Sequence, residues 1–429
     1  IIVIKNKADD KFMYSAEMRS MSTETGHSVL IKVKISVNNK NIVFSLPYIQ
    51  QPIPIGVVFK ALNYTSQEDI INLIGLDSKQ AEKYMRFINR DSFFIRDQKE
   101  ALEYIGKFSM HIISGEKEKY KEKCRDYAQQ VVETELFPHL GISASILDKA
   151  IILGKLVNKL LSTILGIRSC DSKDDFANKR IETAGTLCHE LFRTLFKRWN
   201  SSIQTALDKK KQRYDALAII SHCNSITHGL AHSFSTGNWG VQRNSYIRTG
   251  VSQVLSRLTY GATVSHLRRV IVPVGKEGKN TDIRQIHLSQ FGMVCPSETP
   301  EGSPAGIVLN YSILTQVTNT VNTVVVYEIV SNFVSLIKTD KVELKNISLY
   351  NHVYLNGMLI GFVDDSDKYI EDFKQMRRLG ILHSSVSIVE DDIDQEIRIY
   401  CDSGRTTRPF FSLDKKGCLK IRKSDGSNW

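Results

Sequence analysis

Residues 236–306 read TGNWGVQRNSYIRTGVSQVLSRLTYGATVSHLRRVIVPVGKEGKNTDIRQIHLSQFGMVCPSETPEGSPAG. Between Gly237 and Arg284 there are eight Lys or Arg residues against two acids, and no acid occurs between Gly237 and Ile271. Most of the cations are single arginines among small and polar residues, with glycines between them. This pattern suits a surface that approaches phosphate groups closely. An ordinary basic, glycine-rich loop region of a globular enzyme has the same composition, so charge alone leaves both interpretations open.

The whole chain has 429 residues and a formal net charge of +11. Its 42% hydrophobic and 24% charged residues are typical of a globular protein with several domains and a large core. The excess of positive charge favours a polyanionic partner. No stretch approaches the roughly 18 apolar residues that span a bilayer. The sequence therefore predicts no membrane partner.

Seven scattered cysteines predict reduced thiols in an intracellular compartment, because none forms a Cys-x-x-Cys pair. The adjacent pairs Cys188-His189 and His222-Cys223 point in different directions on a helix and are poor metal ligands. The remaining histidines, including His266, have no spacing typical of a zinc site. We therefore predict no metal site within these residues.

The first part of the chain mixes strand and helix patterns. Alternation of apolar and polar residues in 27–37 predicts a half-buried strand. Residues 42–46 are expected to form the second strand of a hairpin with it. The prolines at 47, 52 and 54 are expected to stop regular pairing. Helical periodicity predicts helices from about Val57 and after Ser66, and over residues 114–136, 148–166 and 180–199. The polar loop 166–179 is a candidate domain boundary.

The later part is rich in strand patterns. Asn356-Gly357 between apolar runs predicts a tight hairpin within 353–363. An amphipathic helix is expected over 366–379, ended by Gly380, and residues 386–389 and 396–401 are expected to form a second hairpin. The predicted fold class is α+β and multidomain, with mixed helical and antiparallel β domains.

Two segments within residues 236–306 resemble catalytic or ligand-binding sites. Gly275-Lys-Glu-Gly-Lys-Asn-Thr resembles a phosphate loop, but a Walker A loop needs four residues between its glycines and a Ser or Thr after its lysine. A hairpin tip with two lysines fits better. Glu298-Thr-Pro-Glu-Gly-Ser-Pro-Ala-Gly carries two carboxylates in a stiff Pro/Gly frame, which suits either ligand positioning or a structural turn. No self-contained catalytic group of residues is evident, which indicates a binding surface or one part of a composite active site.

Several of these motifs, in this order, resemble the second-largest subunit of multi-subunit DNA-directed RNA polymerases, in the eukaryotic, archaeal and large-DNA-virus branch. The similar segments are AEMRS at 16–20, LPYIQQPIPIGVVFKAL at 46–62, FPHLG at 137–141, DDFANKRIETAG at 174–185, TGVSQVLSRLTY at 249–260, ATVSHLRR at 262–269, PVGKEGK at 273–279, RQIHLSQFGMVCPSETPEGSPAGIVLN at 284–310 and SGRTTRPFF at 403–411. The resemblance covers nearly the whole chain.

The resemblance implies a layout in five parts. Residues 1–178 are similar to the family's lobe, and 179–236 to the returning part of its protrusion. Residues 237–314 are similar to the fork, 315–404 to the first external region, and 405–429 to the start of the second.

The resemblance also implies site residues. Arg243–Thr249 matches a fork loop near the RNA–DNA hybrid, and Pro273–Thr281 matches a second fork loop, where downstream DNA strands separate. The implied nucleic-acid-binding or active-site-proximal residues are Gln253, Arg268, Arg269, Lys276, Lys279, Arg284 and Glu301. No residue of this chain is implied to be catalytic. In the family the largest subunit holds the catalytic Mg2+, and the zinc-binding segment of the second-largest subunit lies outside the residues present here.

The implied function is DNA-templated RNA synthesis, with this chain positioning the DNA template, the RNA–DNA hybrid and the incoming nucleoside triphosphate. Implied partners are the largest and other polymerase subunits, the template and the transcript. The chain is not expected to be active alone. It would act in the nucleus if eukaryotic, or in a virion or virus factory if viral. A nucleic-acid-binding scaffold without catalysis stays open as an alternative, and a nucleotide-hydrolysing enzyme is disfavoured by Asn280 and the short glycine spacing.

Overall fold

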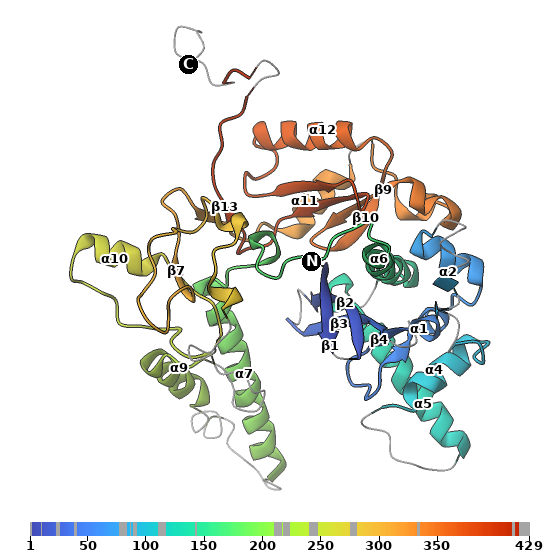
Figure 1. Cartoon of the computed structure of the whole chain (residues 1–429). Helices are drawn as coiled ribbons and strands as arrows, with labels where there is room; N and C mark the ends of the chain where they lie inside the picture. Colours follow the sequence, from blue (N-terminus) through green and yellow to red (C-terminus); the bar gives the residue numbers. More distant parts are fainter. Residues whose placement is uncertain are drawn as a thin grey trace. The chain divides into compact units, whose positions relative to one another are not determined.

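A computed structural model of the chain shows two compact units, which are described separately (Figure 1). Unit 1 contains Ile1–Lys173 and Thr320–Asp402, and unit 2 contains Asp174–Asn319 and Ser403–Trp429. The boundary after Lys173 falls within the polar loop 166–179. The structure describes residues 2–9, 11–22, 26–37, 41–76, 84–85, 87–88, 92–109, 117–141, 144–209, 217, 224–239, 248–274, 281–332, 335–413 and 417–419.

Unit 1 begins with an antiparallel sheet of order β1-β2-β3-β4-β5. Its strands are β1 (Ile2–Asp9), β2 (Phe12–Met21), β3 (Ser28–Ser36), β4 (Ile42–Ser45) and β5 (Ile53–Pro54). The predicted hairpin of β3 and β4 is confirmed, with Val33 opposite Phe44. The prediction that the prolines stop pairing was wrong at Ile53–Pro54, which pairs with Val43 and Phe44 at the sheet edge. Proline is tolerated there because an edge strand leaves one side of its backbone unpaired.

Helices pack on this sheet and on one another. They are α1 (Ile55–Ala61), α2 (Gln67–Ile74), α4 (Gln98–Gly106), α5 (Lys117–Thr134) and α6 (Ile146–Ile164). The helices predicted from about Val57, after Ser66 and over residues 114–136 and 148–166 are confirmed among the described residues, whereas α4 was not predicted. Ser145 caps α6, since its hydroxyl accepts a hydrogen bond from the Asp148 N–H at 3.0 Å. Apolar residues of α6 and of the sheet form one large buried cluster.

A second sheet of unit 1 combines two hairpins around a parallel pair of strands. It contains β9 (Asn351–Leu355), β10 (Met358–Val363), β11 (Ser387–Asp391) and β12 (Glu396–Tyr400) in the order β10-β9-β12-β11. Both predicted hairpins are confirmed. Asn356 and Gly357 form the first turn with positive φ values of 49° and 91°, as a two-residue hairpin requires. The parallel pairing of β12 with β9 was not predicted.

Helix α12 (Ser366–Arg378) connects the two hairpins and buries Tyr369 and Phe373. Gly380 follows its end in the left-handed conformation, as predicted. Shorter helices complete this part: α11 (Thr323–Ser331), η6 (Thr339–Lys341) and η7 (Leu344–Leu349). The predicted α+β, multidomain fold class is confirmed.

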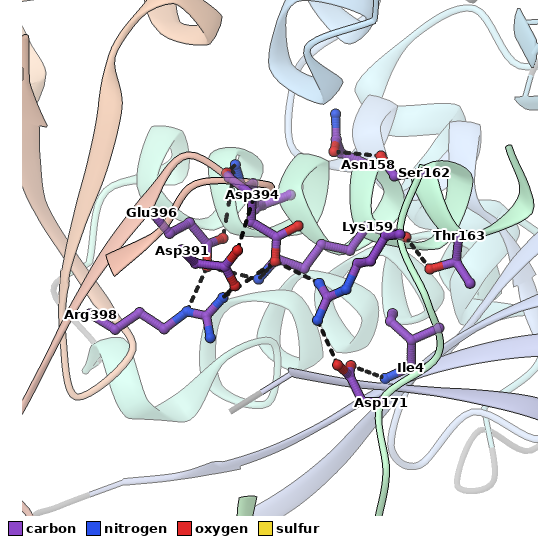
Figure 2. Close-up of polar contacts among 12 residues, drawn as sticks. Ile4, Asn158, Lys159, Ser162, Thr163, Asp171, Asp391, Asp394, Glu396 and Arg398 are labelled. Atoms are coloured by element: carbon purple, nitrogen blue, oxygen red, sulfur yellow. Dashed lines mark hydrogen bonds and ion pairs between the residues drawn. The ribbon is translucent and has the colours of Figure 1, made fainter. Parts of the chain in front are cut away.

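Buried charges join α6 to the second sheet (Figure 2). The Lys159 ammonium contacts the carboxylates of Glu396 at 2.8 Å and Asp394 at 3.1 Å, and the side chains of all three are 3% exposed. The network continues through Lys155, Arg168, Asp171, Asp391 and Arg398. Burial would raise the pKa of Glu396, but the surrounding cations outweigh burial and the pKa is lowered. Glu396 is therefore ionised and is paired within the fold.

A buried histidine makes a second link within unit 1. His139 lies in η1 (Pro138–Leu140), and its Nε2 donates to the Gly357 carbonyl at 3.1 Å. Its Nδ1 therefore accepts from the Ser20 hydroxyl, at 2.7 Å. The ring connects the first sheet to the β9–β10 turn in its neutral form.

We predict that acid weakens unit 1 partly through His139. Burial lowers the pKa of His139 from 6.5 to about 4, so the unfolded chain binds a proton first as the pH falls. This contribution to stability is complete above pH 6.5 and is lost as the pH falls from there through about 4. The measurement is the free energy of unfolding against pH. His139→Leu should flatten the curve between these pH values, whereas replacing the exposed His383 by Ala should not. Equal slopes for the wild type and His139→Leu would contradict the prediction.

Unit 2 is built around two helices and short strand pairs. It contains η2 (Phe176–Asn178), α7 (Ala184–Lys209), α9 (Ser225–Thr236), β8 (Gln316–Val317) and β13 (Thr406–Thr407), with β13 antiparallel to β8. The predicted helix over 180–199 is confirmed and extends further. Trp239 packs with Leu191 and Leu195, and its indole N–H donates to the Ser233 carbonyl at 3.1 Å. Gly237 ends α9 in the left-handed conformation.

Among the described helices, none combines the length and apolar character needed to cross a membrane.

Candidate nucleic-acid interface

A small sheet organises the arginine-rich stretch in unit 2. Helix α10 (Tyr260–Leu267) leads into β6 (Arg269–Ile271), which pairs antiparallel with β7 (Val308–Asn310). Thr259 caps α10, since its hydroxyl accepts a hydrogen bond from the Ala262 N–H at 3.1 Å. Two short 3-10 helices, η4 (Asp282–Arg284) and η5 (Leu288–Gln290), lie between β6 and β7 in the chain. The sheet therefore brings the end of α10 beside the residues that follow the 298–306 loop.

The two carboxylates of the 298–306 loop have different surroundings. Glu298 accepts a hydrogen bond from the Ser265 hydroxyl, which also accepts from the Asn310 amide at 2.9 Å. Thr299 donates to the Val308 carbonyl and accepts from the Gly306 N–H, both at 3.0 Å. Glu301 is exposed and has no hydrogen bond or ion pair to any described residue. The first carboxylate therefore holds the turn, and the second is available to a ligand.

Arg284 braces the same loop. Its guanidinium donates to the carbonyls of Ser303 at 2.6 Å and Ala305 at 2.8 Å. Gly306 has a φ of 72°, and a Cβ at this position would lie 2.7 Å from the Arg284 Cα. Glycine is therefore required where the loop crosses Arg284. Because two backbone carbonyls occupy this guanidinium, it has less capacity for a phosphate than its charge suggests.

The adjacent arginines Arg268 and Arg269 differ in whether their side chains are bonded to other residues of the fold. Arg268 donates to the carbonyls of Ser312, Ile313 and Thr315, and its guanidinium lies 5.9 Å from the centre of the Tyr311 ring. Arg269 is exposed on β6 and makes no side-chain hydrogen bond or ion pair with a described residue. Arg268 lies at the C-terminal end of α10 and Arg269 begins β6, so the two side chains leave backbone of different local conformation. Arg269 is thus the arginine of this pair that is free to bind an anion.

Gln253 is positioned by a histidine that the sequence did not single out as a site residue. Nδ1 of His266 accepts from the Ser256 N–H at 3.1 Å, so Nε2 carries the proton. Nε2 lies 3.0 Å from the Gln253 side-chain oxygen, to which it donates. Thr263 also holds this segment, since its hydroxyl donates to the Ser256 carbonyl at 2.8 Å. No sequence signal pointed to His266, because its partners lie 10 and 13 residues earlier in an irregular segment.

Several predicted site elements lie outside the described residues. Lys276, Lys279 and most of Arg243–Thr249 are among them. Of the seven predicted site residues, the structure therefore places Gln253, Arg268, Arg269, Arg284 and Glu301. Their roles toward nucleic acid stay predictions. Within the ranges described, no group of three or more His, Cys, Asp or Glu side chains is arranged to hold a metal ion.

Unit 2 exposes many large apolar side chains around this stretch. The buried cluster found among its described residues contains Leu191, Leu195 and Trp239. The exposed apolar residues within the stretch and just after it include Val254, Leu258, Tyr260, Leu267, Ile286, Leu288, Phe291, Ile313 and Leu314. Apolar surface of this extent is typical of a protein face that other molecules or other domains cover.

Comparison with known proteins gives three matches to family models, in chain order. Residues 1–182 match RNA polymerase Rpb2, domain 2, residues 253–317 match domain 3, and residues 353–414 match domain 4. The second of these matches contains α10, the β6–β7 pair and the 298–306 loop. The models therefore cover most of unit 1 and most of the arginine-rich stretch of unit 2.

Individual relatives agree with the family models. The chain is 34% identical over 441 residues to "DNA-directed RNA polymerase II subunit 2" of Arabidopsis thaliana, covering 99% of this chain and 36% of that protein. It is 35% identical to a probable RNA polymerase II subunit RPB2 homolog of Invertebrate iridescent virus 6, covering 96% and 37%. It is 31% identical to "DNA-directed RNA polymerase subunit Rpo2" of Sulfolobus acidocaldarius, again covering 96% and 37%. The chain thus spans slightly more than a third of the length of these relatives.

These matches define a class of protein, the subunits of multi-subunit RNA polymerases. Within that class, the chain belongs to the Rpb2 family of second-largest subunits. The resemblance noted in the sequence is confirmed.

Proposed function

We propose that this chain takes part in DNA-templated RNA synthesis as a portion of the second-largest subunit of a DNA-directed RNA polymerase. The observation that carries the proposal is the contrast between Arg269 and its neighbours within the match to domain 3. Arg268 and Arg284 are engaged with backbone carbonyls, whereas Arg269 is exposed without a partner among the described residues. An exposed guanidinium without a partner among the described residues, in a sequence segment (237–271) that contains no acid, suits a phosphate contact.

In this proposal the chain positions the reactants of nucleotidyl transfer. The RNA 3′ hydroxyl attacks the α-phosphate of the nucleoside triphosphate, and pyrophosphate leaves. Magnesium ions, held by the largest subunit, would stabilise the charges on the attacking and leaving oxygens. Arg269 and the Gln253 amide would contact the sugar–phosphate backbone of the hybrid, and the Glu301 carboxylate would face the nucleotide-addition site. Backbone contacts serve an enzyme that must accept any sequence.

The braces described above explain how the site would keep its geometry. His266 holds the Gln253 side chain, and Arg284 with Thr299 holds the loop that carries Glu301. Well-positioned groups contribute more to a transfer reaction than mobile ones, since their orientation is set before the reactants bind. Lys276 and Lys279 would add phosphate contacts where the downstream DNA strands separate. The partners would be the largest and other polymerase subunits, the template, the transcript and nucleoside triphosphates.

Replacing Arg269 by Ala in the complete enzyme is expected to shorten the lifetime of the elongation complex about ten-fold, the effect of losing one charge-assisted hydrogen bond. The salt dependence of dissociation should weaken by about one phosphate contact. Arg269→Lys should lie between the wild type and Arg269→Ala, because lysine keeps the charge without the planar fork. Transcript extension and complex lifetime at several salt concentrations measure these effects.

A matched control is Arg378→Ala, which removes an exposed arginine from α12 in unit 1. It should leave extension and salt dependence unchanged. If Arg269→Ala behaves like this control, the proposed contact is wrong. If the complete protein binds nucleic acid but never purifies with a chain that supports primer extension in the presence of Mg2+, the chain is a non-catalytic scaffold.

A further inference from the structure

The Asn-Gly pair of this sequence forms the turn between β9 and β10. Asn356 and Gly357 have positive φ values of 49° and 91°, and both residues are partly exposed, so water reaches them. When glycine follows asparagine, the glycine nitrogen can attack the asparagine side-chain amide, because glycine places no side chain in the way. Whether this chemistry occurs depends on how the fold holds the amide.

Cys401 holds the Asn356 side chain at both of its polar atoms. The Cys401 N–H donates to Asn356 Oδ1 at 2.9 Å, and Asn356 Nδ2 donates to Cys401 Sγ, also at 2.9 Å. The Asn356 N–H donates to the Ile399 carbonyl at 2.8 Å. The side chain thus continues the parallel pairing of β9 with β12 beyond this backbone bond. Because Cys401 is fully buried, the amide is fixed against the end of β12.

The backbone after Asn356 is held as well. The Gly357 carbonyl accepts the proton of His139 Nε2 at 3.1 Å. Attack by the Gly357 nitrogen would make Asn356 Cγ tetrahedral and would move Oδ1 and Nδ2 out of the plane in which both contact Cys401. In the folded chain, the attack therefore requires the two hydrogen bonds with Cys401 to break first.

We propose that Asn356 is a deamidation site, which the folded chain keeps closed through Cys401 and which opens when the β9–β10 turn separates from β12. In the open state, hydroxide removes the proton of the Gly357 N–H, and this nitrogen bonds to Asn356 Cγ. The Cγ–Nδ2 bond breaks, and Nδ2 takes a proton from water and leaves as ammonia. Water then adds to either carbonyl carbon of the resulting succinimide and opens the ring to aspartate or isoaspartate. The reaction exchanges ammonia for water, and no atom is oxidised or reduced.

Both products change the turn. A carboxylate only accepts hydrogen bonds, so aspartate at this position cannot donate to the Cys401 sulfur. Isoaspartate continues the chain through its side-chain carbon and lengthens the backbone of a two-residue turn, whose length sets the register of β9 and β10. A long-lived opening of unit 1 would therefore become irreversible at this site. The site depends on unit 1 alone and is independent of the proposed role in RNA synthesis.

The test follows the peptide that contains Asn356 by mass spectrometry, in the complete protein within its complex, at mildly alkaline pH. Asn356 should deamidate at least about ten-fold more slowly in the folded protein than in the same chain unfolded in urea, because two hydrogen bonds must break first. Asn356→Gln identifies the signal, since its longer side chain closes a ring much less readily and should give at most a trace of product in urea. Equal rates in the folded and unfolded chains would overturn the proposal.

A substitution tests the role of Cys401. Cys401→Ala removes the sulfur but keeps the N–H, so deamidation in the folded protein should become about five-fold faster, the effect of losing one hydrogen bond. Cys401→Ser keeps an acceptor beside Nδ2 and should lie between the wild type and Cys401→Ala. The matched control is Cys124→Ala, which removes a buried thiol from α5 in the same unit and should leave the rate at the wild-type level.

Hydrogen exchange of the α12 amides in each variant shows whether unit 1 stays folded. A faster rate in Cys401→Ala than in Cys124→Ala, with α12 protected in both, is the expected result. An unchanged rate in Cys401→Ala, or an equal rise in Cys124→Ala, would overturn the proposal. If Cys401→Ala unfolds the unit, Cys401→Ser decides instead: it should exceed the wild-type rate with α12 still protected, and a wild-type rate would contradict the role of the sulfur.

Discussion

Replacing Lys159 by Met is expected to destabilise unit 1 by about 3–5 kcal/mol, the cost of removing the most deeply buried cation from a network of buried carboxylates. The Lys159 ammonium lies 2.8 Å from Glu396 and 3.1 Å from Asp394, and the side chains of all three are 3% exposed. Methionine fills a similar volume, so the lost charge is the main change. Urea unfolding, followed through hydrogen exchange of the α6 amides, reports this unit.

The control for Lys159 is a surface ion pair of the same unit. Lys345 and Glu68 lie 3.1 Å apart, but their side chains are 71% and 67% exposed. Lys345→Met should change the free energy of unfolding by less than about 1 kcal/mol, because water screens exposed pairs. Adding Glu396→Gln to Lys159→Met should cost less than the sum of the two single changes, since the lost contact between these two side chains is counted in both single changes. A loss below about 1 kcal/mol for Lys159→Met would contradict the prediction.

Replacing Gly154 by Ala is expected to destabilise the packing of α6 on α2 by about 1–3 kcal/mol, the usual cost of overpacking a core. Helix propensity alone predicts the opposite sign, since alanine stabilises a helix interior by up to about 1 kcal/mol relative to glycine. The contact decides the sign: a Cβ at Gly154 would lie 2.1 Å from the Leu73 carbonyl oxygen. One turn further along α6, the Asn158 amide donates to the Ile74 carbonyl at 2.7 Å. The end of α2 is thus held against the α6 backbone and cannot move away freely.

The control for Gly154 is Gly185 in α7, where nothing lies within 4 Å of an added Cβ. Gly185→Ala should be neutral or slightly stabilising. Hydrogen exchange of the helix that carries each change reports the effect without assuming that both units unfold together. A gain in stability for Gly154→Ala would show that the contact between α2 and α6 opens without cost.

Much of the fold could be predicted from local patterns. Alternation identified β3 and β4, period 3.6 identified α5, α6, α7 and α12, and Asn356-Gly357 identified the β9–β10 turn. These elements are set by nearest neighbours along the chain and by one buried face each. The pairing of β12 with β9 could not be predicted in this way, because residues of two different hairpins meet in it and no turn specifies that contact.

The burial of these charged side chains could not be predicted from local sequence patterns either. Lys155 and Lys159 follow the polar positions expected of a helix surface, yet Lys159 is buried and Lys155 is only 12% exposed, and both contact Glu396 of β12. Their partners Asp394 and Glu396 lie more than 230 residues later in the chain. The division of the chain into five family-like parts stays a prediction, whereas the structure shows two compact units.

By itself, the sequence determined the family and the position of the arginine-rich stretch, because ordered motifs and charge are properties of the chain that need no coordinates. The tertiary structure alone decided which of these residues are free to act. Arg268 and Arg269 are adjacent and identical in the sequence, but Arg268 lies at the end of α10 and donates to backbone carbonyls, whereas Arg269 begins β6 and is exposed. Glu298 and Glu301 differ in the same way, since Ser265 lies within reach of only the first. Such distinctions depend on contacts between residues distant in the chain, and these exist only once the strands and loops have packed.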